Sequence, residues 1–121
     1  MEVRRLLQSF RYAIEGVGYA LRTQRNMRIH SAVAVVVVGL GYCLRLTRTE
    51  WVAIIFAVAL VLVMEMVNTA IEKTIDLVTS KHHPLAKIAK NVAAGAVLVA
   101  AANAVVIGLL VFSPYLNEVR R

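Results

Sequence analysis

The chain has 121 residues, of which 60% are hydrophobic, and a formal net charge of +7. A soluble domain of this size could not bury so much apolar surface, which argues against the main alternative, a very hydrophobic soluble helix bundle. The composition therefore predicts a single integral membrane domain spanning residues 1–121. Anionic lipid accounts for the basic charge, so we expect no nucleic acid partner.

Residues 1–24 have the pattern of an amphipathic helix. Their apolar residues recur every three or four positions, with arginine and glutamate between them. One alternative is a helix packed on a soluble core, but the rest of the chain offers no such core. We therefore expect this segment to lie in the membrane surface with its apolar face toward the lipid. The apolar set is Val3, Leu6, Leu7, Phe10, Ile14, Val17 and Leu21.

Three later segments, at about 29–46, 51–79 and 85–112, are expected to be membrane helices. Each contains a long stretch with few or no charges, and a spanning helix needs about 20 mostly apolar residues. The chain lacks the many alternating strands of a closed barrel, so helices are the spanning form that remains. The predicted fold class is an all-α integral membrane protein with one surface helix and three transmembrane helices.

Lysine and arginine are distributed unevenly between the ends of these helices. Six precede the first span and four lie in or beside the second connection, whereas two lie in the first connection and two at the C-terminal end. Because Lys and Arg favour the cytoplasmic side of a membrane, we expect the N-terminus in the cytoplasm. Three spans then place the C-terminus outside.

The second predicted span carries polar residues near its C-terminal end. Glu65, Asn68, Glu72 and Asp76 follow at spacings of three and four, so they share one helix face. If Trp51 marks the outer boundary, Glu65 lies about 7 Å inside the inner boundary and the later carboxylates lie at or beyond it. The later carboxylates could be the solvated end of a long helix. A carboxyl at the depth of Glu65 costs about 2.5–3.5 kcal/mol, so we expect it to be functional.

Polar residues of two other segments are expected at the same level. Gln24 lies at the end of the predicted surface helix, and Lys90 and Asn91 lie at the start of the last span. Carboxylates suit a hard cation such as Mg²⁺, basic groups suit phosphates, and a buried carboxylate can accept a proton. The residues alone therefore predict a membrane-embedded site for a cation and a phosphate, beside an acid–base group, and they name no reaction.

Three motifs resemble a known family. EMVNTAIEKTIDLVT, residues 65–79, is followed by KHHPLAKIAKNVAAGAVL, residues 81–98, and preceded by RNMRIH, residues 25–30. Together they resemble the small prokaryotic diacylglycerol kinase family, and most of all its undecaprenol kinase branch in Gram-positive bacteria. The resemblance covers nearly the whole chain. This family is unrelated in fold to soluble kinases, so the absence of a glycine-rich phosphate loop is expected.

The resemblance implies a bacterial cytoplasmic membrane enzyme that transfers phosphate from MgATP to a lipid alcohol. It implies undecaprenol as the acceptor and undecaprenyl phosphate as the product, with diacylglycerol and phosphatidic acid as the alternative. It also implies a homotrimer whose active sites are shared between neighbouring subunits. Mg²⁺ is the implied cofactor, and ATP is the co-substrate.

The family's site residues can be matched to positions in this chain. Glu65 matches the proposed catalytic base, which acts on the lipid hydroxyl. Glu72 matches a metal-binding carboxylate that also belongs to the nucleotide site. Asn68, Asp76 and Lys90 match residues that line the nucleotide site.

Four further positions belong to the implied nucleotide site. Arg5 and Tyr12 fall where the surface helix contributes to it. Gln24 stands where the family usually has a second metal-binding Glu, and Asn91 stands where it usually has Asp. Both departures remove a negative charge. An alternative interpretation is therefore that the protein is a catalytically impaired relative that binds lipid or nucleotide. A small transporter using Glu65 as a proton relay is disfavoured, because the polar residues gather at one membrane face.

Overall fold

The computed structural model describes residues 1–119, which form four helices. These are α1 (Glu2–Thr23), α2 (Arg25–Leu44), α3 (Arg48–Val78) and α4 (Pro84–Val119). The described part of the chain contains no strand. Three helices, α2, α3 and α4, are long and apolar enough to cross a membrane. The predicted all-α fold, with an N-terminal helix followed by three spanning helices, is confirmed.

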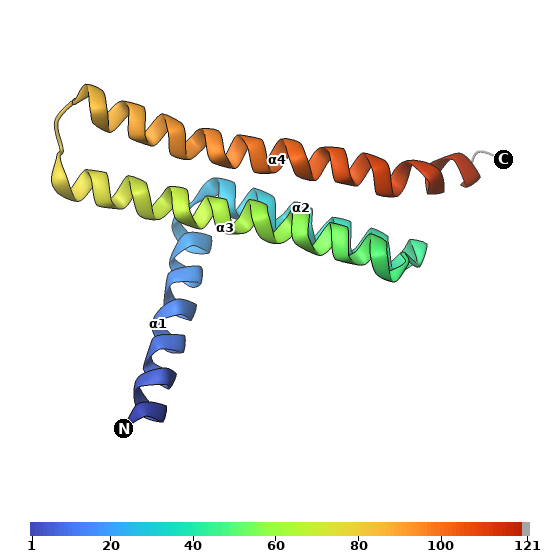
Figure 1. The fold of residues 1–121 in the computed structure, drawn as a ribbon, viewed down its shortest axis with the longest axis horizontal. Coiled ribbons are helices and arrows are strands. Elements are labelled where there is room, and N and C mark those ends of the chain that lie inside the picture. The colour runs from blue at the N-terminus through green and yellow to red at the C-terminus, as the bar shows by residue number, and fades with distance from the viewer. Residues whose placement is uncertain (120–121) are drawn as a thin grey trace.

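Helix α3 is the centre of the bundle. It packs against both α2 and α4, and α1 contacts the bundle only through its C-terminal end, from which it projects steeply (Figure 1). Small side chains dominate the α3–α4 contact, which allows the two backbones to approach closely. The buried residues of these two helices include Ala57, Val61, Ala93, Val97 and Ala100. Helix α3 therefore packs one of its faces against α2 and another against α4.

The turn between α2 and α3 is defined by two local motifs. Leu46 N–H donates to Gly41 O over 3.1 Å and Arg45 N–H donates to Tyr42 O over 3.3 Å, with Arg45 in the left-handed region at φ 56°. This is the Schellman pattern that ends a helix. Glu50 N–H then donates to Thr47 Oγ1, while Thr47 N–H donates to Glu50 Oε1, which is the capping box that begins α3.

The helix bounds differ from the expected spans at several ends. Helix α2 begins at Arg25 and ends at Leu44, instead of covering 29–46. The capping box starts α3 at Arg48, three residues before the expected 51. Helix α4 continues to Val119, well past 112 and through Pro114. The extension has a physical reason: Tyr115 packs beside the core of Leu46 and Ile54, and its hydroxyl donates to Glu50 Oε1 over 2.7 Å.

Helix length places the polar end of α3 outside the hydrocarbon. The 31 residues of α3 extend about 46 Å at 1.5 Å per residue, whereas the hydrocarbon core of a bilayer is about 30 Å thick. About ten residues of α3 therefore lie beyond the hydrocarbon. Because charged side chains are costly in the hydrocarbon, we expect the excess length at the C-terminal end of α3, which carries Glu72 and Asp76.

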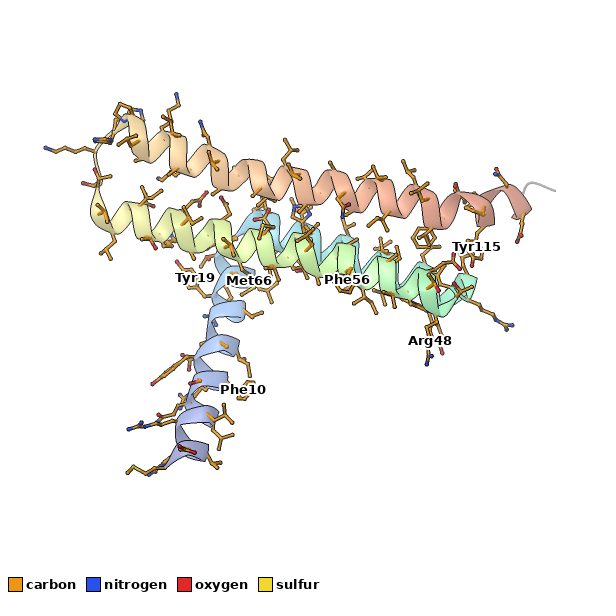
Figure 2. All side chains as sticks on the ribbon, in the orientation of Figure 1. Phe10, Tyr19, Arg48, Phe56, Met66 and Tyr115 are labelled. Atoms are coloured by element: carbon orange, nitrogen blue, oxygen red, sulfur yellow. The ribbon has the colours of Figure 1, made fainter. Side chains whose placement is uncertain are left out.

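Exposed apolar side chains cover α1 and the outer faces of the bundle. On α1 they include Val3, Leu6, Phe10 and Ile14, and Figure 2 shows Phe10 on the part of α1 that stands clear of the bundle. Helices α2, α3 and α4 expose many valines and leucines in the same way. This surface suits contact with lipid or with neighbouring subunits, and α1 fits the expected surface helix. Arg120 and Arg121, which contributed to the predicted charge asymmetry, lie outside the described residues.

Candidate active site at the polar end of the bundle

A polar stripe on α3 forms the centre of the candidate site. Glu65 is 2% exposed and Thr69 is 6% exposed, and both face the interior of the bundle. Thr69 Oγ1 donates to Glu65 O over 2.9 Å, so its hydroxyl is satisfied within the helix. Asn68 Nδ2 donates to Glu72 Oε1 over 3.3 Å. The expected spacing therefore produces two neighbouring polar levels, one at Glu65 and one at Glu72.

Glu65 has a neighbour that sequence reasoning missed. His30 Nε2 on α2 lies 3.3 Å from Glu65 Oε1, although the orientation falls short of a hydrogen bond and Oε1 has no hydrogen-bond partner among the described residues. His30 closes the motif RNMRIH, which was noted for its resemblance alone. The signal that could have found it is positional: the N-terminal end of α2 must lie at the same membrane level as the C-terminal half of α3.

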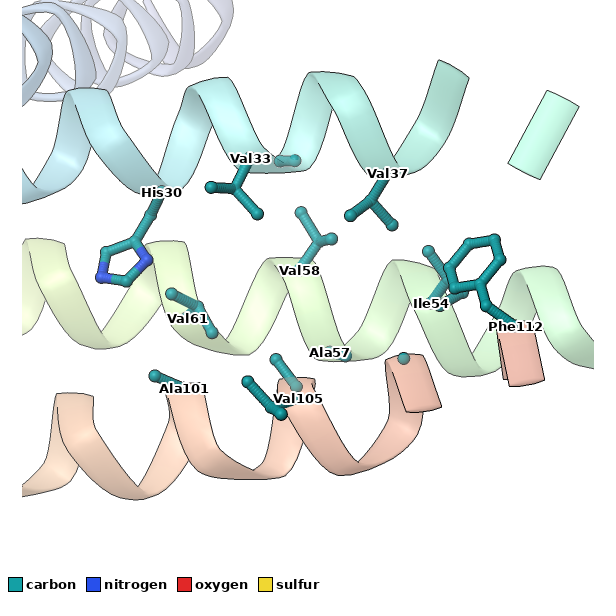
Figure 3. A pocket seen from close by; sticks show the side chains of 13 residues that line it. His30, Val33, Val37, Ile54, Ala57, Val58, Val61, Ala101, Val105 and Phe112 are labelled. Carbon is teal, nitrogen blue, oxygen red and sulfur yellow. The ribbon is translucent and has the colours of Figure 1, made fainter. Parts of the chain in front are cut away.

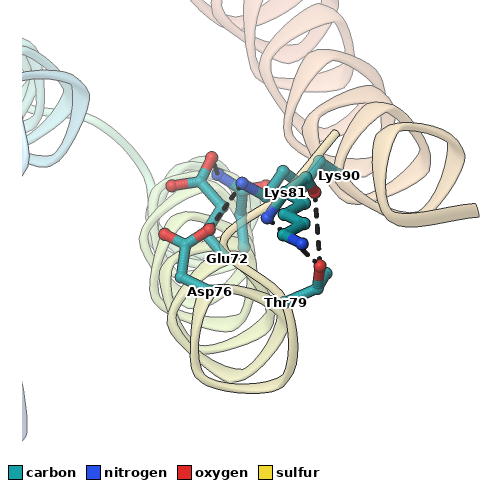
Figure 4. A network of polar contacts seen from close by, with 6 residues as sticks. Glu72, Asp76, Thr79, Lys81 and Lys90 are labelled. Atoms are coloured by element: carbon teal, nitrogen blue, oxygen red, sulfur yellow. Dashed lines mark hydrogen bonds and ion pairs between the residues drawn. The ribbon is translucent and has the colours of Figure 1, made fainter. Parts of the chain in front are cut away.

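A second cluster joins α3 to α4. Lys90 Nζ donates to Asp76 Oδ1 over 2.7 Å, and Figure 4 shows the pair near Glu72 and the turn at Thr79. The turn is held by Thr79, whose hydroxyl oxygen accepts from Lys81 N–H over 3.3 Å. His83 Nδ1 accepts from Leu85 N–H over 3.1 Å at the start of α4. The hairpin thus brings together one carboxylate and one ammonium group that are 14 residues apart in sequence.

A polar recess of about 220 Å³ lies beside this cluster. Its lining includes Asp76, Lys87, Lys90 and Asn91, together with the turn between the helices. Two lysines close together favour binding of phosphate oxygens. The recess therefore has side chains that suit phosphate oxygens.

A second, apolar cavity lies deeper in the bundle. Its volume is about 290 Å³, and it is lined by α2, α3 and α4. His30 is the polar residue of this lining, and the other lining side chains are apolar or small, from Val61 and Ala101 to Phe112 (Figure 3). The cavity thus runs from the level of Glu65 into the hydrophobic part of the bundle.

The remaining predicted residues are not gathered into this site within one chain. Arg5 and Tyr12 lie on α1, which projects away from the bundle, and both are exposed. Gln24 is half-buried at the junction of α1 and α2, where its Nε2 donates to Thr23 Oγ1 over 3.1 Å. Asn91 is exposed in the recess beside Lys90. One chain therefore brings together the α3 stripe, His30, Lys90 and Asn91.

The donor set near Glu72 fits a hard cation. Asn68 Oδ1 is buried without a hydrogen-bond partner among the described residues, and it belongs to the side chain that bonds to Glu72. Carboxylate and amide oxygens are the ligands that Mg²⁺ accepts. No group of three or more His, Cys, Asp or Glu within residues 1–119 could by itself hold a metal ion. Two protein ligands are common for Mg²⁺, which usually keeps waters and substrate phosphates in its shell.

Comparison with known proteins places this arrangement in a family. The sequence profile described as prokaryotic diacylglycerol kinase matches residues 11–112. An undecaprenol kinase of Bacillus subtilis (strain 168) is 45% identical over 115 residues, which cover 95% of this chain and 94% of the relative. A diacylglycerol kinase of Synechocystis is 46% identical over 114 residues, which cover 93% of this chain and 65% of the relative.

A more distant relative covers most of both chains. A diacylglycerol kinase of Escherichia coli (strain K12) is 28% identical over 102 residues, which cover 84% of each. The matched region contains α2, α3 and the polar residues of the candidate site. The protein therefore belongs to the prokaryotic diacylglycerol kinase family.

Proposed function

We propose that the protein transfers a phosphoryl group from MgATP to the hydroxyl of a membrane lipid alcohol, with undecaprenol as the preferred acceptor. The carrying observation is a carboxylate, Glu65, that is buried within a membrane-spanning helix and lies about 10 Å along that helix from Glu72. A lipid hydroxyl stays near its own depth, whereas a nucleotide arrives from water. Two polar levels on one helix suit two such substrates.

At the deeper level, Glu65 would act as the base. Its carboxylate accepts the proton of the lipid hydroxyl while the hydroxyl oxygen attacks the γ-phosphorus and the bond to ADP breaks. A carboxylate has two oxygens, so one can accept this proton while the other is held by a neighbouring donor. The apolar cavity beside it would keep water away from the reacting hydroxyl.

At the shallower level, the chain would bind MgATP. Glu72 and Asn68 would hold the divalent cation, and Mg²⁺ bound there would neutralise phosphate charge. Lys90 contacts the phosphates from the recess, while Asp76 orients its ammonium group and Asn91 lines the same recess. Phosphoryl transfer needs mostly alignment and charge neutralisation, which these side chains can provide without a glycine-rich loop.

The proposed enzyme is a homotrimer with shared sites. Arg5 and Tyr12 lie on a helix that projects away from its own bundle, which supports a site that they complete in a neighbouring subunit. The extensive exposed apolar surface of α2, α3 and α4 is compatible with such packing. Gln24 lies at the base of the projecting helix, where it could complete the metal site with its amide oxygen.

We place the protein in a bacterial cytoplasmic membrane with its N-terminus in the cytoplasm. This orientation puts the MgATP recess on the side where ATP is present, and it agrees with the distribution of Lys and Arg. The C-terminus would then lie outside. A transporter would need polar residues through the whole depth of the bilayer. The polar residues of this chain gather at one membrane face instead, which argues against transport.

Diacylglycerol is the second candidate acceptor. The undecaprenol kinase of Bacillus subtilis matches nearly the full length of both chains, whereas the diacylglycerol kinase of Synechocystis has a similar identity and a longer chain. Both lipids present a primary hydroxyl at the membrane interface. A third candidate, an impaired relative that binds lipid or nucleotide, rests on the missing charges at Gln24 and Asn91.

The test is a kinase assay with the purified protein in mixed micelles. Radiolabelled γ-phosphate is followed from MgATP into extracted lipid, with undecaprenol, with diacylglycerol and with no acceptor. The proposal expects labelled undecaprenyl phosphate and little ATP consumption without lipid. Label in neither lipid would contradict the proposed activity. Label mainly in phosphatidic acid would mean that diacylglycerol, and not undecaprenol, is the preferred acceptor.

A further inference from the structure

His30 is a titratable side chain at the proposed base to which the proposed function gives no role. Its Nε2 lies 3.3 Å from Glu65 Oε1, and the Glu65 side chain is 3% exposed whereas the His30 side chain is 26% exposed. The two residues come from different helices, α2 and α3. The contact is therefore a tertiary relationship, formed only when the N-terminal half of α2 packs beside α3.

The surroundings of Glu65 make this neighbour important. Thr69, the nearest hydroxyl on the same face of α3, donates to the main-chain carbonyl of Glu65 and leaves the carboxylate alone. Asn68 turns its amide toward Glu72. No described group hydrogen-bonds Oε1, so the imidazole is the N–H donor placed to do so. A buried oxygen without a partner is unfavourable, which favours a small rotation that completes this bond.

His30 also lies at one end of the lining of the apolar cavity. It is one of the lining residues, and it contributes the polar end of a lining otherwise made of apolar or small side chains (Figure 3). A hydroxyl whose hydrocarbon tail occupies the apolar side would therefore arrive where the imidazole and the carboxylate meet. The orientation of the Glu65 carboxylate therefore decides whether this hydroxyl can reach one of its oxygens.

We infer that His30 is a positioning residue that holds the Glu65 carboxylate toward the apolar cavity, so that one oxygen is bonded to the imidazole N–H and the other receives the substrate hydroxyl. The inference rests on the proposed function, because it assigns a role around the proposed base. In this role the imidazole acts as a hydrogen-bond donor from Nε2.

Variants of His30 distinguish this role from simple packing. His30→Gln keeps an N–H donor at a similar reach, whereas His30→Ala removes the donor. We expect His30→Ala to lower kcat about 10- to 100-fold, the scale of a misplaced catalytic group, with the KM for MgATP unchanged. His30→Gln should recover most of the loss. Val35→Ala, on the exposed face of α2, is the matched control and should behave as the unaltered protein.

A spectroscopic measurement tests the inference without catalysis. With glutamate labelled by ¹³C at the side-chain carboxyl, the Glu65 signal is identified by its loss in Glu65→Gln. We expect that signal to broaden or split in His30→Ala and to stay single in His30→Gln. An unchanged Glu65 signal in His30→Ala would overturn the positioning role, whether or not the protein proves to be a lipid kinase.

The kinetic outcomes separate the two proposals. Turnover by the unaltered protein with equal kcat in His30→Ala would overturn the inference and leave the proposed function standing. Equal losses in His30→Ala and His30→Gln would also overturn it, because a donor alone would then be insufficient. If the unaltered protein phosphorylates neither lipid, the proposed function fails and the carboxyl signal alone decides whether His30 positions Glu65.

Discussion

Lys90 Nζ and Asp76 Oδ1 lie 2.7 Å apart and join the cytoplasmic-side ends proposed for α3 and α4. Both residues were predicted for the nucleotide site, and the structure pairs them with each other at the edge of the polar recess. The pair holds the ammonium group against α3 before any nucleotide arrives. An ammonium held in place loses less side-chain freedom when a phosphate binds, which favours binding.

Replacement of Lys90 should weaken binding of MgATP. Lys90→Met removes the cation beside the proposed phosphates, and we expect the KM for MgATP to rise about 10- to 100-fold, the range of a hydrogen bond between charged groups. Lys73→Met is the matched control, since it removes the same charge from an exposed position of α3 outside the recess lining. Titration of MgATP against lipid phosphorylation measures both. If both substitutions raise the KM for MgATP equally, the effect comes from the loss of net charge and not from a phosphate contact of Lys90.

Replacement of Glu65 should strongly lower the rate of phosphoryl transfer and leave nucleotide binding unchanged. Glu65→Gln keeps the size and polarity of the side chain but removes the base, so turnover should fall about 10²- to 10⁴-fold, the usual contribution of general base catalysis. Binding of a labelled nucleotide with Mg²⁺ should remain near that of the unaltered protein. A loss of nucleotide binding as large as the loss of turnover would move Glu65 into the nucleotide site.

The sequence predicted the parts of the site that lie along one helix. The spacing of Glu65, Asn68 and Glu72 follows from helical periodicity alone, and the structure places them on the inward face of α3. Contacts between helices were less accessible to such reasoning. The contact of Glu65 with His30 depends on the register between α2 and α3, which no local pattern specifies.

The fold shows the same division. Hydrophobic stretches predicted three spanning helices and an amphipathic first helix, all of which are present. Their ends were harder to locate, because the start of α3 depends on a capping box at Thr47, and the end of α4 depends on a tertiary contact of Tyr115. The angle at which α1 leaves the bundle is likewise a property of the junction at Gln24, where extended backbone separates two helices.

The two departures from the family pattern can be tested by restoring the charges. Gln24→Glu and Asn91→Asp should each raise kcat/KM, by about 5- to 150-fold if each restores one charged hydrogen bond. Gln24→Glu should also lower the Mg²⁺ concentration needed for half-maximal rate, because a carboxylate attracts the cation more strongly than an amide. Magnesium titrations of both variants and of the double variant measure this. Unchanged rates and magnesium dependence would mean that Gln24 and Asn91 belong to a working site.

Packing at the turn between α2 and α3 gives a prediction on stability. A Cβ at Gly41 would lie 2.8 Å from Leu46 Cδ1 and 3.1 Å from the Trp51 ring, whereas a Cβ at Gly39 meets nothing within 4 Å. Both Gly→Ala changes gain the same helix propensity. The difference between the unfolding free energies of the two variants therefore reports the steric cost of the added Cβ. We expect Gly41→Ala to be less stable than Gly39→Ala by about 1–3 kcal/mol, the usual cost of overpacking. Unfolding by SDS in mixed micelles measures the difference, and equal stabilities would mean that Leu46 and Trp51 yield without strain.

The central claim is that one membrane-embedded site joins MgATP to a lipid hydroxyl, with undecaprenol preferred. The most direct measurement offers undecaprenol and diacylglycerol at equal mole fraction in the same micelles, with labelled MgATP, and separates the lipid products. The account predicts that label enters undecaprenyl phosphate faster than phosphatidic acid, and that Glu65→Gln forms both products at least about 100-fold more slowly. Label that enters no lipid, or a rate of lipid phosphorylation in Glu65→Gln near that of the unaltered protein, would contradict it.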